Sequence, residues 1–119
     1  MNARGSLDGQ VAFVTAGGGG IGRAIALGLA EAGANVAVFE IVPERAEETA
    51  ARIRELGRQA LAIPGDAMDA EAIRAAIAAT DERFGRLDIL VNNAGGVSAR
   101  PVLEQSERSW RRHIDINLV

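Results

Sequence analysis

The stretch from Val11 to Gly22 combines residue types that could hold a phosphate. The apolar run Val11–Thr15 is followed by Ala16 and four consecutive glycines, after which an apolar-faced segment begins at Ile21. A strand that ends in glycines and restarts as a helix leaves backbone N–H groups open, and the helix dipole favours an anion beside them. The sequence therefore predicts a nucleotide phosphate site at this turn.

A carboxylate, Glu40, ends the next apolar run, about 20 residues after the glycines, the separation typical of a dinucleotide site. It could accept hydrogen bonds from both adenosine ribose hydroxyls, and it would repel a 2′-phosphate. Because the next residue is Ile41 rather than an arginine, the sequence favours NAD over NADP. A solvated acid at a strand end is the alternative interpretation. A P-loop is excluded, since Gly22-Arg23-Ala24 stands where that motif has lysine and then serine or threonine.

Composition limits the chemistry further. The chain has no Cys and no Tyr, and all 13 basic residues are Arg, so it has no Lys. The lack of Cys excludes disulfides, thiolate metal ligands and a Cys nucleophile, and no metal site is predicted. A formal charge of −3 gives no field that would attract nucleic acid. No apolar run approaches the roughly 20 residues that span a bilayer, so we expect a cytoplasmic protein without nucleic-acid or membrane partners.

The elements that must position these groups alternate along the chain. The apolar runs predict strands at 11–15, 35–40, 60–63 and 87–91, each followed by a helical pattern. Asp69 is predicted to cap the third helix, and Ser106 a fourth that continues to the end of the chain. The first helix is predicted to turn one apolar face inward, made of Ile21, Ala24, Ile25, Gly28, Leu29 and Ala32.

Four strand–helix repeats predict right-handed βαβ units and a parallel sheet. We therefore expect an α/β fold, a Rossmann-type doubly wound sheet that is incomplete, with about four strands in the order 3-2-1-4 and flanking helices. The fourth strand would then form an uncovered edge.

Several motifs, taken in order, resemble the cofactor half of the classical short-chain dehydrogenase/reductase family. They are Thr15 to Gly22, Asp66, Asn92-Asn93-Ala94-Gly95 and Asn117. The family pattern Thr-Gly-x-x-x-Gly-x-Gly is matched by Thr15, Gly20 and Gly22, but Ala16 replaces the first glycine, so we expect weakened rather than lost binding. The resemblance covers residues 7–119 and identifies residues 1–119 as the N-terminal dinucleotide-binding part of one domain, ending inside the fourth helix.

The resemblance also implies roles for individual residues. Asn93 would lie near the nicotinamide ribose, and Asn117 would hold a water of a proton relay. Asp66 and the Ala67 backbone would hold the adenine edge. The pyrophosphate would lie on the backbone of Gly17, Gly18, Gly19, Gly20 and Ile21, while Ala94 and Gly95 would let the fourth strand pass close to the cofactor.

The family resemblance implies an NAD(P)-dependent oxidoreductase that moves a hydride between nicotinamide and an alcohol or ketone. The Tyr, Lys and Ser of the family's proton transfer follow later in its sequences, so we expect this chain to be inactive alone. A homo-oligomer is expected at full length. The alternative hypothesis is a non-catalytic dinucleotide-binding or interaction module.

Overall fold

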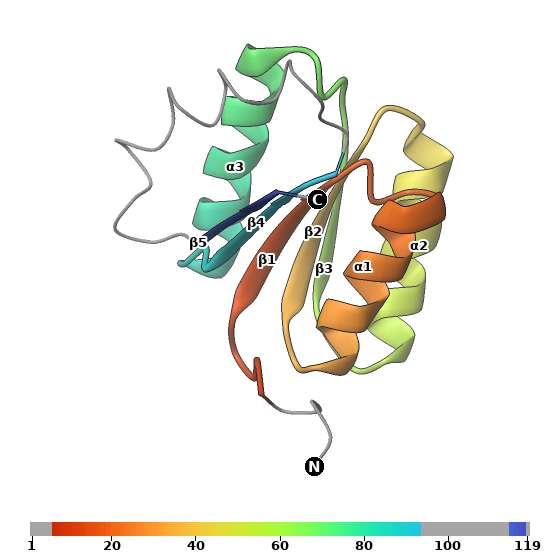
Figure 1. Cartoon of the computed structure of the whole chain (residues 1–119), viewed down its shortest axis with the longest axis vertical. Coiled ribbons are helices and arrows are strands. Elements are labelled where there is room, and N and C mark those ends of the chain that lie inside the picture. The colour runs from red at the N-terminus through yellow and green to blue at the C-terminus, as the bar shows by residue number, and fades with distance from the viewer. Residues whose placement is uncertain (1–5, 94–114, 119) are drawn as a thin grey trace.

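The computed structural model of the chain describes residues 6–93 and 115–118. Five strands and three helices lie in these ranges, and the strands form one parallel sheet (Figure 1). The elements, in chain order, are β1 (Val11–Thr15), α1 (Gly20–Glu31), β2 (Asn35–Glu40), α2 (Pro43–Glu55), β3 (Ala60–Pro64), α3 (Ala70–Phe84), β4 (Ile89–Asn92) and β5 (Asp115–Leu118).

The strand order is β3-β2-β1-β4-β5, and every neighbouring pair is parallel. The order reverses direction between β1 and β4, which is the topological switch point of a doubly wound sheet. The predicted fold class and the predicted order 3-2-1-4 are therefore confirmed.

The end of the chain departs from the prediction. Residues 115–118 form β5, which runs parallel to β4 with Val91 opposite Asn117, rather than part of a fourth helix. Polar and apolar residues alternate from Asp115 to Leu118, a period that suits a strand. β4 is consequently paired on both sides and is not the sheet edge. The part of the predicted helix before residue 115 lies outside the described residues.

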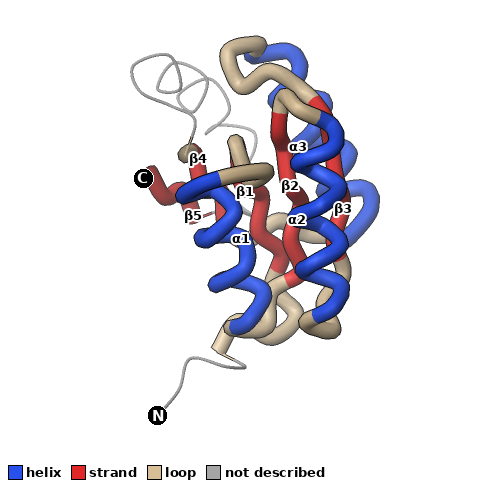
Figure 2. Tube along the Cα trace, turned by 90° about the vertical axis from the view of Figure 1, so that its right-hand side faces the viewer, coloured by secondary structure: helices blue, strands red, loops and turns tan. Residues whose placement is uncertain are grey.

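The sheet is covered on both faces, as its nearly continuous apolar strands predict. α1 and α2 pack on one face against Val14, Val36 and Val38, while α3 packs on the other against Phe13 and Phe39. Figure 2, in which α1 and α2 face the viewer, shows α3 behind the sheet.

The predicted inward face of α1 is confirmed in part. Ala32 is buried, and Ile25 and Leu29 pack against the core. Ile21, Ala24 and Gly28 are exposed, so the prediction is wrong at these three positions. The residues of α1 that are buried are Gly22, Ala26 and Ala30, whereas Ile21 is 67% exposed. Small residues let the helix axis approach the sheet closely, and the larger side chains of Ile25 and Leu29 flank the contact. This close approach brings the first turn of α1 against the end of β1.

The two ends of α3 agree with the prediction from the sequence. The side chain of Asp69 accepts hydrogen bonds from the backbone N–H groups of Glu71 and Ala72 at 3.0 and 3.3 Å, which confirms the predicted cap. Gly85 ends α3 with a φ of 80°, a left-handed conformation that glycine adopts without a Cβ penalty. α3 is thereby fixed at both ends by local sequence.

Candidate functional site

The turn between β1 and α1 forms the centre of the candidate site. Gly19 is the N-cap of α1, its lack of a side chain leaves no cap hydrogen bond, and the first helical turn carries no acidic residue. Within the described part of the chain, no group accepts a hydrogen bond from the N–H of Gly19, Gly20, Ile21 or Gly22. Four donors and the positive end of a helix therefore converge on one open place, which suits an anion.

Two glycines of this turn have no room for a side chain. A Cβ at Gly22 would lie 1.9 Å from the Ala16 carbonyl oxygen and 2.9 Å from Asn93 Nδ2. A Cβ at Gly18 would lie 2.4 Å from Glu40 Cγ. A side chain at either position would clash with these neighbouring atoms, so both positions require glycine.

Ala16 stands where the family pattern has its first glycine, and its backbone is left-handed, with a φ of 56°. That region costs a residue with a Cβ about 1–2 kcal/mol. The strain is the structural counterpart of the missing first glycine.

Replacing Ala16 with glycine is expected to stabilise the chain by about 1 kcal/mol or less, because relief of strain exceeds the added chain entropy of glycine. Thermal unfolding would measure the change. The matched control is Ala24→Gly at an exposed position of α1, which should destabilise the chain by a similar amount. Equal destabilisation by both substitutions would contradict a strained turn.

Thr15 and Asn93 join the carboxyl ends of β1 and β4. The Thr15 hydroxyl donates to Asn92 Oδ1 at 3.2 Å and accepts from the Asn93 N–H at 2.9 Å. Because Thr15 is only 2% exposed, it positions the two strand ends instead of offering a surface to a ligand. These bonds place Asn93 beside Gly22, so the structure brings these two predicted residues together.

Glu40 lies at the end of β2 with both carboxylate oxygens engaged. Oε1 accepts the Gly18 N–H at 3.2 Å and Oε2 accepts the Val42 N–H at 3.1 Å. The residue is 7% exposed, so the alternative of a solvated acid is wrong. A carboxylate has about four acceptor positions, which leaves capacity for two hydroxyl donors.

A cleft of about 160 Å³ opens beside Glu40, between the ends of β2 and β3. Ile41 and Met68 expose 60% and 63% of their surface here, an unusual concentration of apolar side chains next to polar ones. Asp66 Oδ1 accepts the Met68 N–H at 2.9 Å, which shapes the rim. The cleft is lined by Ala16, Phe39, Glu40, Ile41, Gly65, Asp66, Ala67 and Met68. A flat, largely apolar ring with a polar edge fits this lining.

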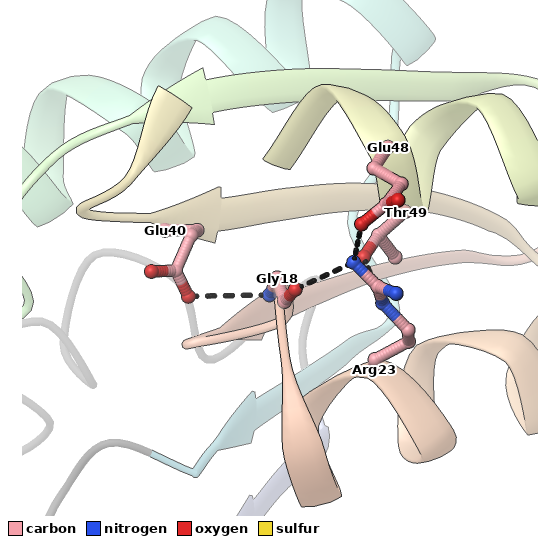
Figure 3. Close-up of polar contacts among 5 residues, drawn as sticks. All are labelled: Gly18, Arg23, Glu40, Glu48 and Thr49. Atoms are coloured by element: carbon pink, nitrogen blue, oxygen red, sulfur yellow. Dashed lines mark hydrogen bonds and ion pairs between the residues drawn. The ribbon is translucent and has the colours of Figure 1, made fainter. Parts of the chain in front are cut away.

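One site residue was missed by sequence reasoning. Arg23 on α1 reaches α2 and the turn: Nε donates to Thr49 Oγ1 at 2.9 Å, and Nη2 donates to the Gly18 carbonyl at 2.8 Å and to Glu48 Oε1 at 2.6 Å. The Arg23 hydrogen bond, and secondly its charge, hold the pKa of Glu48 below its ordinary value. Figure 3 shows Gly18 between Glu40 and Arg23.

Arg45 is a second cation near the turn. Its side chain lies against the glycines, since a Cβ at Gly18 would come 2.6 Å from Arg45 Cβ and one at Gly19 would come 3.9 Å from Arg45 Cδ. From the sequence, position 41 was the only predicted place for a positive charge near the ribose, and Ile41 occupies it.

Three predicted site residues lie after β4 in the sequence. Ala94 and Gly95 lie outside the described residues. Asn117 lies in β5, opposite Val91 of β4, so its predicted helical setting was wrong. Among residues 6–93 and 115–118, no group of three or more His, Cys, Asp or Glu side chains could hold a metal ion, and none of the helices is long and apolar enough to cross a membrane.

Known proteins are similar to this chain in sequence and in fold. A family model described as short chain dehydrogenase matches residues 10–119. The chain belongs to this family. It is 47% identical over 116 residues to the short chain dehydrogenase/reductase astE of Aspergillus oryzae, covering 96% of this chain and 44% of that protein.

Solved structures of the family agree with the fold. A short chain dehydrogenase from Burkholderia cenocepacia in complex with NADP is 36% identical, with a TM-score of 0.82 over 94% of this chain and 55% of that one. A 7α-hydroxysteroid dehydrogenase complexed with NADH and 7-oxoglycochenodeoxycholic acid is 41% identical, with a TM-score of 0.74 over 80% of this chain and 36% of that one. The chain thus spans less than half the length of the curated relatives it matches.

Proposed function

We propose that this chain is the N-terminal, dinucleotide-binding part of a single dehydrogenase domain that uses NAD to interconvert an alcohol and a ketone. The observation that carries the proposal is the turn before α1. Four N–H groups at this helix N-terminus have no acceptor in the described chain. Family membership supports the same reading, since relatives with this fold are solved with NADP or NADH.

The residues present fit a dinucleotide. The backbone from Gly17 to Ile21 would hold the pyrophosphate, because Gly18 and Gly22 keep side chains out of the approach. Asn93, beside Gly22, would lie near the nicotinamide ribose. In this proposal Asp66 and Ala67 hold the adenine edge in the cleft, Ala94 and Gly95 allow close passage of the chain after β4, and Thr15 positions the turn.

The bound cofactor would supply the hydride chemistry. The chain itself binds and orients, and Asn117 is the residue we assign to a proton-relay water. A phenol or amine for proton transfer is missing from these 119 residues, because they contain neither Tyr nor Lys. Catalysis of the proposed reaction therefore needs groups that this chain does not supply.

NAD is proposed over NADP because of Glu40. Its buried carboxylate is fixed by two backbone donors, so its negative charge cannot easily move away from a 2′-phosphate. At about 4 Å, two unit charges of like sign repel by roughly 1–4 kcal/mol, depending on solvent exposure.

Calorimetric titration of the chain with NAD, followed by assays with secondary alcohols, tests the proposal. We expect saturable NAD binding, weaker NADP binding and no turnover. A chain that binds neither dinucleotide would contradict the site, and robust turnover would contradict the need for further groups. Extending the chain separates this proposal from the alternative of a non-catalytic module. If the chain is part of an enzyme, a downstream segment that supplies Tyr and Lys should give turnover. If the chain is a non-catalytic module, the same extension should give none.

A further inference from the structure

We propose that Arg23 is a positioning residue for the cofactor turn, holding the Gly18 peptide so that Glu40 and the turn N–H groups are preset for the nucleotide. This inference rests on the proposed function and adds to it a residue that stands outside the family's glycine pattern. It arises from the contacts of one backbone segment, Gly18, whose two polar groups are held from opposite sides (Figure 3).

Gly18 has no side chain to fix its own conformation, so its backbone would otherwise have wide freedom. Its N–H is bound by Glu40 Oε1 at 3.2 Å, and its carbonyl is bound by Arg23 Nη2 at 2.8 Å. Each bond has one charged partner, and the second is the shorter, at 2.8 Å against 3.2 Å, which makes it the stronger of the two. Arg23 is therefore the main restraint on the peptide that follows Gly18.

The direction of that restraint matters for the ligand. In a planar trans peptide the C=O and the next N–H point opposite ways. With the Gly18 carbonyl held toward Arg23, the Gly19 N–H must point away from the Arg23 guanidinium. Gly19 is the N-cap of α1, so the same bond sets the first donor of the open helix end.

Arg23 is itself well fixed. Its Nε donates to Thr49 Oγ1, a fully buried hydroxyl on α2, and its side chain is 19% exposed. Glu48, whose side chain is 58% exposed, accepts the third contact of the Arg23 side chain on the surface side. A guanidinium makes these three contacts with its rigid fork, whereas a lysine ammonium could not span them together.

The test compares two arginines of the same chain. Arg54 also pairs with a carboxylate, Glu47 at 3.0 Å, and donates to a backbone carbonyl, Ala60 at 3.1 Å, but near the C-terminal end of α2. Arg23→Met is expected to raise the Kd for NAD about tenfold, the order expected for one hydrogen bond to a charged group. Arg54→Met should leave the Kd within about twofold, since Arg54 does not contact Gly18.

Adenosine separates position from charge. It carries no phosphate, so loss of the Arg23 charge has no direct effect on it, whereas a displaced Gly18–Glu40 pair would weaken its ribose contacts. NMR titration with adenosine should therefore show weaker binding to Arg23→Met than to Arg54→Met. An effect on NAD alone would show that Arg23 does not position the Gly18–Glu40 pair and would overturn the inference.

Arg23→Lys keeps the experiment decisive if the methionine variant does not fold. It preserves the charge and loses the fork, so we expect a Kd for adenosine and NAD above that of the unaltered chain. Unaltered binding by the lysine variant would overturn the inference. An unaltered chain that binds neither ligand would instead contradict the proposed function, and the inference with it.

Discussion

Gly22→Ala is expected to raise the Kd for NAD by a hundredfold or more and to lower the thermal stability of the chain. The new methyl group would lie 1.9 Å from the Ala16 carbonyl oxygen and 2.7 Å from its carbon, both backbone atoms. Ala16 already has a φ of 56°, so the turn has little freedom to withdraw. Overpacking against fixed atoms costs about 1–3 kcal/mol or more and would displace the N–H groups of the turn. Calorimetric titration and thermal unfolding measure the two effects.

The same helix offers a matched control. Gly28 also lies in α1, but a Cβ there meets nothing within 4 Å. Gly28→Ala should stabilise the chain by about 0.5–1 kcal/mol, because glycine is unfavourable inside a helix, and should leave NAD binding unchanged. If Gly22→Ala bound NAD as well as Gly28→Ala did, the turn would not be the pyrophosphate site.

Glu40→Gln is expected to shrink the preference for NAD over NADP by tenfold or more. The substitution removes the charge that repels a 2′-phosphate, a repulsion of about 1–4 kcal/mol per pair of unit charges. The positive charge of Arg45, whose side chain lies against Gly18 and Gly19, is then no longer opposed at this place. NAD itself should bind several-fold less tightly, because the Gln amide nitrogen replaces one of the two carboxylate oxygens and cannot accept the Gly18 or Val42 N–H that this oxygen bound. Parallel titrations with the two dinucleotides give the ratio.

Glu44→Gln serves as the control for net charge. Glu44 lies in the first turn of α2, is exposed, and makes no contact with the turn glycines in the described structure. It changes the total charge by the same unit, so the ratio of affinities should stay close to that of the unaltered chain. An equal shift in both variants would show that the general field, and not Glu40, selects the cofactor.

The sequence by itself determined the local parts of this site. The glycine run after an apolar strand, the acid at the end of β2 and the cap at Asp69 each depend on neighbours a few residues away, which a single sequence displays directly. Strand order followed as well, because βαβ connections are right-handed and leave few topologies. The positions of the turn and of Glu40 in the candidate site could therefore be predicted from the sequence.

Other features depend on contacts between distant segments, and only the tertiary structure decided them. Periodicity marked α1 as amphipathic but did not tell which of two adjacent stripes faces the sheet; the small residues Gly22, Ala26 and Ala30 do, because they permit closer packing. The strand at 115–118 forms by pairing with β4, a partner more than 20 residues away in sequence. Both outcomes depend on contacts with segments that lie far away in the sequence.

Arg23 illustrates the same limit at the site itself. In the sequence it is a residue that rules out a P-loop, and nothing nearby marks it for a role. Its partners Glu48 and Thr49 lie 25 and 26 residues away, and they meet it only because α1 and α2 pack side by side on one face of the sheet. Sequence thus specified a turn that could hold a phosphate, and the packing of α2 determined which residue holds that turn in place.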